Sequence, residues 1–258
     1  MIKRVQWENH DLWLITFINI LWMFIIMAGA PALFIDVAGY LLVVFLPILV
    51  LYIIYLIVTK SFREMGFSSF EAIIIVFVSF LLGSGVIDAY IGISFSNVYL
   101  FTYHEYWLVG INIGGAVIPL LLSCYLFIKN RLNIGVVFIG TVIVSLVSFF
   151  VTYPDPEKGI VSMFPFWLLP IIIASLSSVY LCWREKRKAA PVAYIIGTLG
   201  VLIGADCLHL MALLEYDLLS PRNAIIGGAN VFDMVFITGI LAVFLDGLLF
   251  VQQKGKKK

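Results

Sequence analysis

Long apolar runs alternate with short polar stretches along the whole chain. A helix needs about 20 residues to cross a hydrocarbon core about 30 Å thick. The polar stretches, such as KSFREMGFSS, YPDPEKG and EYDLLSPRN, carry turn and helix-capping residues. Eight runs are long enough, at roughly 12–34, 38–58, 70–92, 107–128, 132–152, 164–183, 191–212 and 229–251. The pattern predicts an all-α fold, a polytopic transmembrane helical bundle of about eight spans, as a single integral membrane domain over residues 1–258.

The composition agrees with this class. Hydrophobic residues make up 63% of the 258 residues and charged residues 12%, with a mean hydropathy of +1.10. Soluble domains carry about a quarter charged residues, so the expected partner is a lipid bilayer. The basic residues stand in short clusters without interleaved aromatics, which argues against nucleic-acid binding. The three cysteines match neither a zinc pattern nor a disulfide framework, and we predict no cofactor.

The basic residues also predict an orientation. The N-terminus, the 59–69 loop, the 129–131 turn, the REKRK loop and the KGKKK tail together hold all but two of the 16 basic residues. Basic residues collect in cytoplasmic loops, so we expect a multi-pass protein of the cell membrane with both termini in the cytoplasm. The start of the chain also resembles a cleavable signal peptide, although Glu8 and Asp11 interrupt its basic region.

Four aspartates fall within the predicted spans, which hold no Lys or Arg. A charged side chain in the hydrocarbon costs at least about 2.5 kcal/mol, so such an acid is a functional candidate. With a rise of about 1.5 Å per residue, four polar residues lie about 7–10 Å outward of the bilayer midplane: Asp88, Asn112, Asp206 and Asp233. We expect these four to share a site, the alternative being that each reaches interfacial water from a helix end. Asp246 lies alone toward the cytoplasmic end, where we expect it to snorkel or pair, and it is left out of the site.

Neighbouring residues are consistent with a shared site. Small and polar residues recur on one face of the 107–128 run, at Asn112, Gly115, Ala116, Pro119 and Ser123. Pro119 removes a backbone donor and releases a carbonyl near Gly115, which is tolerated against protein or a cavity. His209 follows Asp206 by three residues, so it is expected on the same face, bonded to Asp206 or to water at the outer surface.

A short motif occurs twice. Ile-Gly-Gly-Ala stands at 113–116 and at 226–229, and each copy follows a segment with an outward-lying aspartate, Asp88 or Asp206. Two parallel four-helix repeats, 12–128 and 132–251, would explain the order and spacing. The second copy, with Gly227, Gly228 and Asn230, predicts an unwound entry whose amides meet an anion or water. A tightly packed glycine turn is the alternative.

Three segments carry a family resemblance: VGINIGGAVIPLLLS, GTLGVLIGADCLHL and AIIGGANVFDMVFITGILA. With these, the sequence resembles an uncharacterised prokaryotic membrane family, domain-of-unknown-function family 1614, over about residues 70–250. The resemblance implies a multi-pass membrane protein and no particular activity. The family pattern points to Asn112, Gly114, Gly115, Pro119, Gly204, Asp206, Gly227, Gly228 and Asp233. An asparagine is more usual near Asp88.

These observations favour transport of a cation, a proton or a small solute. The ion or substrate site would comprise Asp206, Asp233, Asn112, Asp88, His209, Asn230, Gly114, Gly115, Gly227 and Gly228. Without basic partners, its acids would be protonated or balanced by a bound cation.

An intramembrane aspartyl protease is the first alternative, with Asp206 and Asp233 as the catalytic pair. The segments IGAD and VFD resemble the paired motifs of presenilin-like enzymes, although Ala205 replaces a required glycine and the motif order is reversed. A membrane scaffold or assembly protein, whose polar residues only lock helices together, is the second alternative. Whether the chain is an enzyme stays open.

Overall fold

The structure is a computed structural model that describes residues 16–21, 23, 32–218, 220–228 and 234–255. The chain divides into two units, Met1–Tyr55 and Leu56–Lys258. The first unit contains a helical stretch at residues 16–21 and most of α2 (Ala32–Glu64). The predicted 12–34 span falls largely outside the described residues. Apart from the helix Leu41–Glu64, which runs through both units, the features discussed below belong to the second unit.

The second unit is mostly helical. Capping residues account for several helix starts: Ser68 and Glu71 form a reciprocal capping box on α3, and Asn133 accepts the amide of Gly135 at the start of α6. Pro170 occupies the first turn of α7, where its missing N–H is harmless. The helices are α3 (Ser69–Gly83), α4 (Val86–Ile91), α5 (Ile118–Lys129), α6 (Ile134–Val151), α7 (Leu169–Leu181), α8 (Ala189–Val201), α9 (Leu208–Leu214) and α10 (Met234–Gly255).

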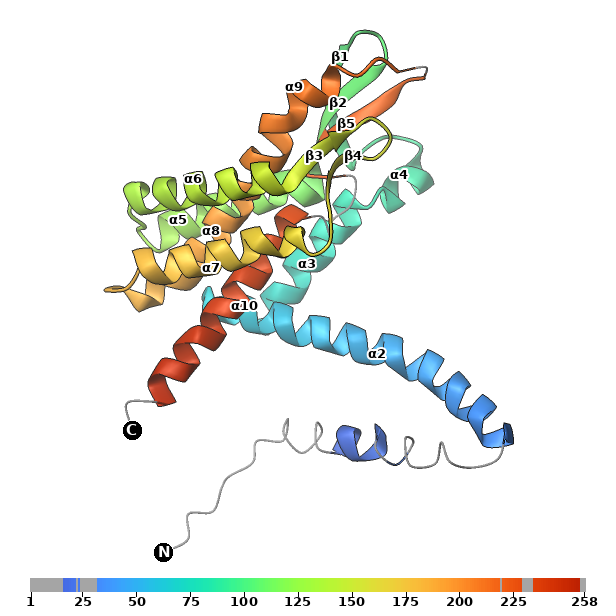
Figure 1. Cartoon of the computed structure of the whole chain (residues 1–258), viewed down its shortest axis with the longest axis vertical. Helices are drawn as coiled ribbons and strands as arrows, with labels where there is room; N and C mark the ends of the chain where they lie inside the picture. Colours follow the sequence, from blue (N-terminus) through green and yellow to red (C-terminus); the bar gives the residue numbers. More distant parts are fainter. Residues whose placement is uncertain (1–15, 22, 24–31, 219, 229–233, 256–258) are drawn as a thin grey trace, which may run out of the picture. The chain divides into compact units, whose positions relative to one another are not determined.

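The described residues also contain five strands. β1 (Asn97–Tyr103) and β2 (Trp107–Asn112) form a hairpin, and β5 (Arg222–Ile226) pairs with β2 in parallel. A second hairpin consists of β3 (Thr152–Asp155) and β4 (Gly159–Ser162). Figure 1 shows the strands gathered at one end of the helices, which we call the strand end. The α5–α6 turn and the α7–α8 loop lie at the opposite end, the loop end.

The prediction of one helix over 107–128 is wrong for its first six residues. They form β2, in which Trp107 and Val109 are fully covered, and the helix proper starts only at Ile118. A short apolar run fits a buried strand as well as a helix, and periodicity alone does not separate the two. The predicted 70–92 span also breaks, because α3 ends at Gly83 and Gly85 adopts a left-handed conformation with φ +73° before α4.

Among the described residues, three helices are long and apolar enough to cross a membrane: Leu41–Glu64, Ile134–Val151 and Lys186–Leu214. Four shorter apolar helices accompany them, at Ser69–Gly83, Ile113–Lys129, Phe166–Leu181 and Met234–Leu249. These helices are compatible with a membrane protein. The eight spans and the four-plus-four repeat remain predictions.

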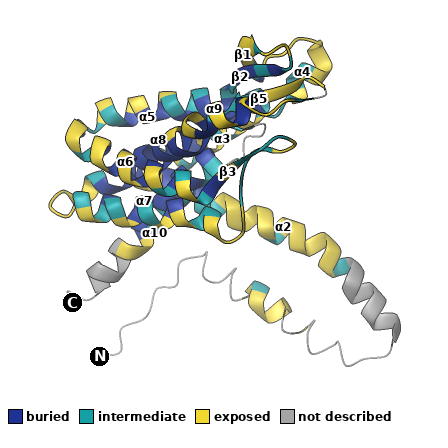
Figure 2. Ribbon diagram, turned by 45° about the horizontal axis from the view of Figure 1, so that its top comes forward, coloured by how far each residue is buried: buried dark blue, intermediate teal, exposed yellow. Residues whose placement is uncertain are grey.

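Helix α8 forms the centre of the second unit. Figure 2 shows the buried residues concentrated on it, and it packs against α6, α7 and α10. Small residues allow the close approach: a Cβ on Gly200 would lie 2.5 Å from Cβ of Val144 on α6. On the α10 side, a Cβ on Gly239 would lie 2.6 Å from Oγ1 of Thr198. Such small-residue contacts are typical of helix packing in membranes.

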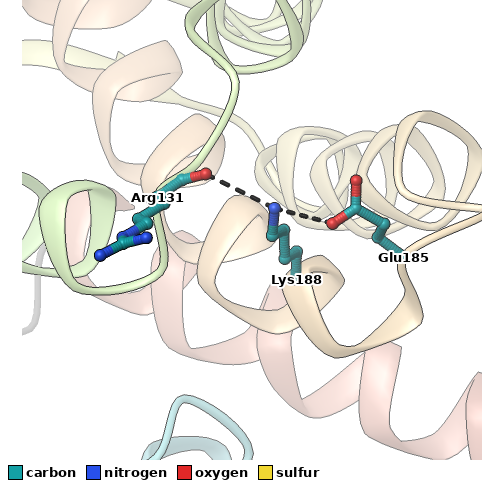
Figure 3. A network of polar contacts seen from close by, with 3 residues as sticks. All are labelled: Arg131, Glu185 and Lys188. Atoms are coloured by element: carbon teal, nitrogen blue, oxygen red, sulfur yellow. Dashed lines mark hydrogen bonds and ion pairs between the residues drawn. The ribbon is translucent and has the colours of Figure 1, made fainter.

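The loop end is held by a short polar network (Figure 3). Nζ of Lys188 forms an ion pair with Glu185 at 2.7 Å and donates to the carbonyl of Arg131 at 3.5 Å. The network joins the α5–α6 turn to the α7–α8 loop, and other basic residues of these loops, Lys129, Arg184, Lys186 and Arg187, share this end. The strand end carries Lys158 and Arg222.

A candidate site between two π-helical turns

Two π-helical turns interrupt the helices near the strand end. η1 (Ile113–Val117) follows β2 directly, and η4 (Leu202–Cys207) separates α8 from α9. π-Turns are rare, widen the helix by one residue per turn, and often mark functional sites. Their alanines, Ala116 and Ala205, belong to one buried apolar cluster. The two turns therefore contribute to the same part of the core.

Asp206 lies in the second turn and is almost fully buried, with 7% of its surface exposed. Its Oδ2 atom accepts a hydrogen bond of 2.6 Å from the amide of Gly227. Gly227 follows β5 and has φ +85°, a left-handed conformation that glycine adopts freely. The bond joins the π-turn of Asp206 to the sheet.

Asp206 also lines two cavities. One has a volume of about 230 Å³, and its wall includes Asn97, Asn223, Gly228 and the exposed Lys158. The other has a volume of about 260 Å³, and its described lining residues other than Asp206 are Thr152, Ile160, Ser162, Trp167, Val201, Ala205, Met234 and Ile237. Ile160 of β4 borders both cavities. Asp206 is thus an acidic group at the shared wall of two small cavities, one of which has a lysine in its wall.

Asn112 connects three elements at the start of η1. It is fully buried, and its Nδ2 group donates to the carbonyl of Gly83 at 3.0 Å and to Oδ1 of Asn97 at 3.1 Å. Its Oδ1 atom accepts the amide of Gly115 at 2.7 Å. These bonds use both amide hydrogens and cap the π-turn. The structure therefore shows Asn112 tying α3 and β1 to η1.

Three of the four glycines of the predicted site, Gly114, Gly115 and Gly227, lie where backbones approach closely. A Cβ on Gly114 would stand 2.1 Å from the carbonyl oxygen of Ser79, and one on Gly115 would stand 1.9 Å from the carbonyl oxygen of Gly227. Gly228 has φ +71° and borders the smaller of the two cavities. Side chains at Gly114, Gly115 or Gly227 would push η1 away from α3 or from the β5 turn.

Asp88 lies on the exposed helix α4 and holds the loop that follows it. Its carboxylate accepts the amide of Phe95 at 2.8 Å, the amide of Ser96 at 3.0 Å and the Ser96 hydroxyl. The Ser96 hydroxyl, followed by these amides, lowers the pKa of Asp88 despite partial desolvation. Ser96 Oγ also accepts a bond from Asn97, the partner of Asn112. A polar chain thus runs from Asp88 to η1.

His209 bonds to α6. Its Nε2–H donates to the carbonyl of Phe149 at 3.0 Å, and its ring stacks on the Phe149 ring with 4.5 Å between centroids. The sequence prediction placed His209 and Asp206 on one face by α-helical spacing. The intervening turn is π-helical, with a different rotation per residue.

Two residues of the predicted site, Asp233 and Asn230, lie outside the described residues, so the contact between Asp206 and Asp233 stays a prediction. Within the described part of the chain, no three His, Cys, Asp or Glu side chains gather to hold a metal ion.

Asp246 on α10 was excluded from the site by the sequence argument, which placed it alone at its depth. In the structure it is buried, with 1% exposed, and bonds to two serines of α7. The serine hydroxyls of Ser175 and Ser178 each lie 2.7 Å from one carboxyl oxygen. The sequence contains no signal for this cluster, because the two serines lie about 70 residues before Asp246 on another helix.

Comparison with known protein families identifies the family of the chain. Residues 89–245 match the family described as "Protein of unknown function (DUF1614)". The chain belongs to this family. The resemblance noted in the sequence is thereby confirmed, and the match covers more than half of the chain. It includes both π-turns, Asp206 and the β5 turn of this DUF1614 protein. No curated protein and no solved structure matches the chain.

Proposed function

We propose that this DUF1614 protein spans the cell membrane and transports a small cation or a proton through a site built around Asp206. The observation that supports it best is the position of Asp206: a buried acid in a π-turn, at the wall of two cavities. An acid within an apolar helix is costly, and in membranes such acids mark ion and proton pathways.

The surface of the second unit supports the membrane part of the proposal. Helices α5, α6 and α7 contain no charged residue except Lys129 at the end of α5. They nevertheless expose large apolar side chains, including those of Leu121, Ile128, Phe138, Leu146, Phe150 and Leu176. Apolar surface on this scale is not left in water by monomeric soluble proteins. Lipid chains would cover it.

The orientation is part of the same proposal. Lys and Arg side chains concentrate at the loop end, which we assign to the cytoplasm together with both termini. Single cysteines in place of Glu157 in the β3–β4 turn and Glu185 in the α7–α8 loop test this. In a background with Cys124, Cys182 and Cys207 replaced by serine, an impermeant maleimide added to intact cells should label only the cysteine at 157. Labelling of only the cysteine at 185 would contradict the orientation.

Flux in proteoliposomes tests the activity itself. The purified protein, reconstituted with a pH-sensitive dye inside, should dissipate an imposed pH or cation gradient. Asp206→Asn should abolish this flux, because the amide keeps an acceptor for Gly227 but carries no charge. The matched control is Asp217→Asn, at an exposed acid that accepts the Tyr106 hydroxyl and lies outside the cavities. Equal flux through the wild type and Asp206→Asn would overturn the proposal.

A further inference from the structure

The cluster around Asp246 contains more hydrogen-bond acceptors than its hydroxyl protons can serve. The Ser175 hydroxyl contacts Oδ1 of Asp246 at 2.7 Å. Oγ of Ser178 lies 2.7 Å from Oδ2 of Asp246 and also 2.7 Å from the carbonyl oxygen of Ser175. A serine hydroxyl has one proton. It can point directly at only one of these two acceptors.

A proton on Asp246 removes this conflict. If the carboxyl is ionised, one of the two contacts of Ser178 joins oxygens with no hydrogen directed between them. If Oδ2 carries a proton, that proton is donated to Oγ of Ser178, and the Ser178 hydroxyl is donated to the Ser175 carbonyl. The Ser175 hydroxyl then completes the set by donating to Oδ1. Each of the three oxygen–oxygen contacts of 2.7 Å is then a hydrogen bond with its own proton. Buried polar groups in proteins are nearly always hydrogen-bonded in this way.

The surroundings also favour the neutral acid. Within the described residues, Asp246 forms no ion pair. The titratable side chains near α10 on the elements packed against it are Cys182, Tyr194, Glu64 and Lys60. Lys60 lies over the Phe244 ring, and residues two apart on a helix do not share a face. Burying an unpaired carboxylate is costly, so the group takes up a proton instead.

We propose that Asp246, Ser175 and Ser178 form a proton-binding site in which Asp246 is a neutral carboxylic acid at neutral pH. The proton leaves Oδ2 for water at the loop end and returns by the same route, so the site exchanges one proton and no other atom. Cys182, beside this site, borders an open cavity of about 920 Å³ at the loop end. That cavity gives water an approach.

This site is distinct from that of Asp206. Asp206 lies beside β5 at the strand end, whereas Asp246 lies beside the end of α7. Between them, the α8–α10 contact buries the hydroxyls of Tyr194, Thr198 and Thr238. A role for Asp246 as the proton-binding site on the cytoplasmic side of a transport path rests on the proposed function. Its protonation does not, because it is inferred from the serine contacts and the burial of Asp246.

Infrared difference spectroscopy of the full-length protein in lipid tests the inference. A protonated carboxyl has a carbonyl stretch separate from that of a carboxylate. We expect the wild type to show the band of a protonated carboxyl at neutral pH, and Asp246→Asn to lose it. Asp206→Asn is the matched control, and its spectrum should keep the band that disappears in Asp246→Asn. A spectrum of Asp246→Asn identical to that of the wild type in this region would overturn the inference.

The stability of the same variant gives a second test. Asparagine reproduces the neutral acid, since its Oδ1 accepts from Ser175 and its Nδ2 donates to Ser178. We therefore expect Asp246→Asn to fold and to melt at the same temperature as the wild type. Failure of Asp246→Asn to fold would also overturn the inference.

The infrared result and the flux result separate the two proposals. Loss of the band in Asp246→Asn without any wild-type flux would leave the proton site standing and refute transport. Flux that depends on Asp206, with no band lost in Asp246→Asn, would refute the proton site and leave transport standing.

Discussion

Gly227 links both π-turns of the structure, through its carbonyl to Gly115 and through its amide to Asp206. A Cβ on Gly115 would stand 1.9 Å from the Gly227 carbonyl oxygen, and the Gly227 amide donates to Asp206 over 2.6 Å. Residues 226–227 of the second Ile-Gly-Gly-Ala segment thus lie in contact with β2 and η1. Ile226 pairs with Ile111 in the parallel register, so the second motif starts opposite a residue two positions before the first motif.

Replacing Gly227 with alanine should destabilise the protein more than the same change at Gly159. Both glycines have nearly the same left-handed φ, +85° and +83°. A left-handed alanine costs about 1–2 kcal/mol at either position. A Cβ at 227 would in addition lie 2.4 Å from Cβ of Ala116, whereas a Cβ at 159 has no neighbour within 4 Å. Overpacking should add about 1–3 kcal/mol at 227 only. Reversible unfolding in detergent measures the difference in stability. Equal losses of unfolding free energy in the two variants would show that η1 shifts to accommodate the new Cβ without an energetic penalty.

The sequence predicted most helices of the second unit, because their apolar runs are long and uniform. The predicted spans 132–152 and 191–212 correspond to α6 and to α8 through α9. The strands were missed for a physical reason: WLVGIN is apolar on both faces when covered by protein, so its pattern does not differ from that of a buried helix. Local spacing cannot reveal a sheet that forms between residues 97–112 and 222–226.

The same limit applies to the candidate site. Asp206 and the glycines stood out because an acid and paired glycines are unusual in apolar runs. The partner of His209 did not, because a π-turn changes the spacing on which the prediction relied. The importance of Asp246 was missed since its partners, Ser175 and Ser178, lie some 70 residues away on another helix. Common serines give no signal until the fold brings them to an acid.

Asn112→Ala should be one of the more destabilising single substitutions in the chain. It would leave the Gly115 amide, the Gly83 carbonyl and the Asn97 side chain without their partner. A buried polar group that loses its partner costs about 1–3 kcal/mol, so the total should be about 3 kcal/mol or more. The control is Asn133→Ala, which removes one exposed helix cap and should cost about 1 kcal/mol. Unfolding curves that coincide for the two variants would refute this assignment to Asn112.

The loop after α4 should loosen in acid. The Ser96 hydroxyl and the amides of Phe95 and Ser96 hold the pKa of Asp88 below its ordinary value of 3.8. A lowered pKa in the folded state stabilises the loop above the unfolded pKa, and this contribution is lost as the pH falls through the folded pKa. The protection of the Phe95 and Ser96 amides against hydrogen exchange, relative to the intrinsic rate at each pH, should therefore fall below about pH 4.

Asp88→Asn provides the control for that experiment. The variant carries no titrating group at this position, so exchange at Phe95 and Ser96 should be faster than in the wild type at neutral pH. It should also show no further opening of this loop in acid. If the wild type and the variant respond to acid alike, the response originates elsewhere, for instance at Asp155, whose pKa is lowered by the amides of Glu157 and Lys158.

Two substitutions of Asp206 should separate its contribution to stability from its role in transport. Asp206→Ala removes the acceptor of the Gly227 amide, and a buried polar group that loses its partner costs about 1–3 kcal/mol. Asp206→Asn can turn its amide oxygen toward Gly227, so its free energy of unfolding should fall by less than half as much as that of Asp206→Ala. Flux, in contrast, should be absent from both, because neither side chain can hold a proton or balance a cation. If the flux of Asp206→Asn falls only in proportion to the loss of folded protein, Asp206 only stabilises the turn after β5, and the transported ion binds elsewhere.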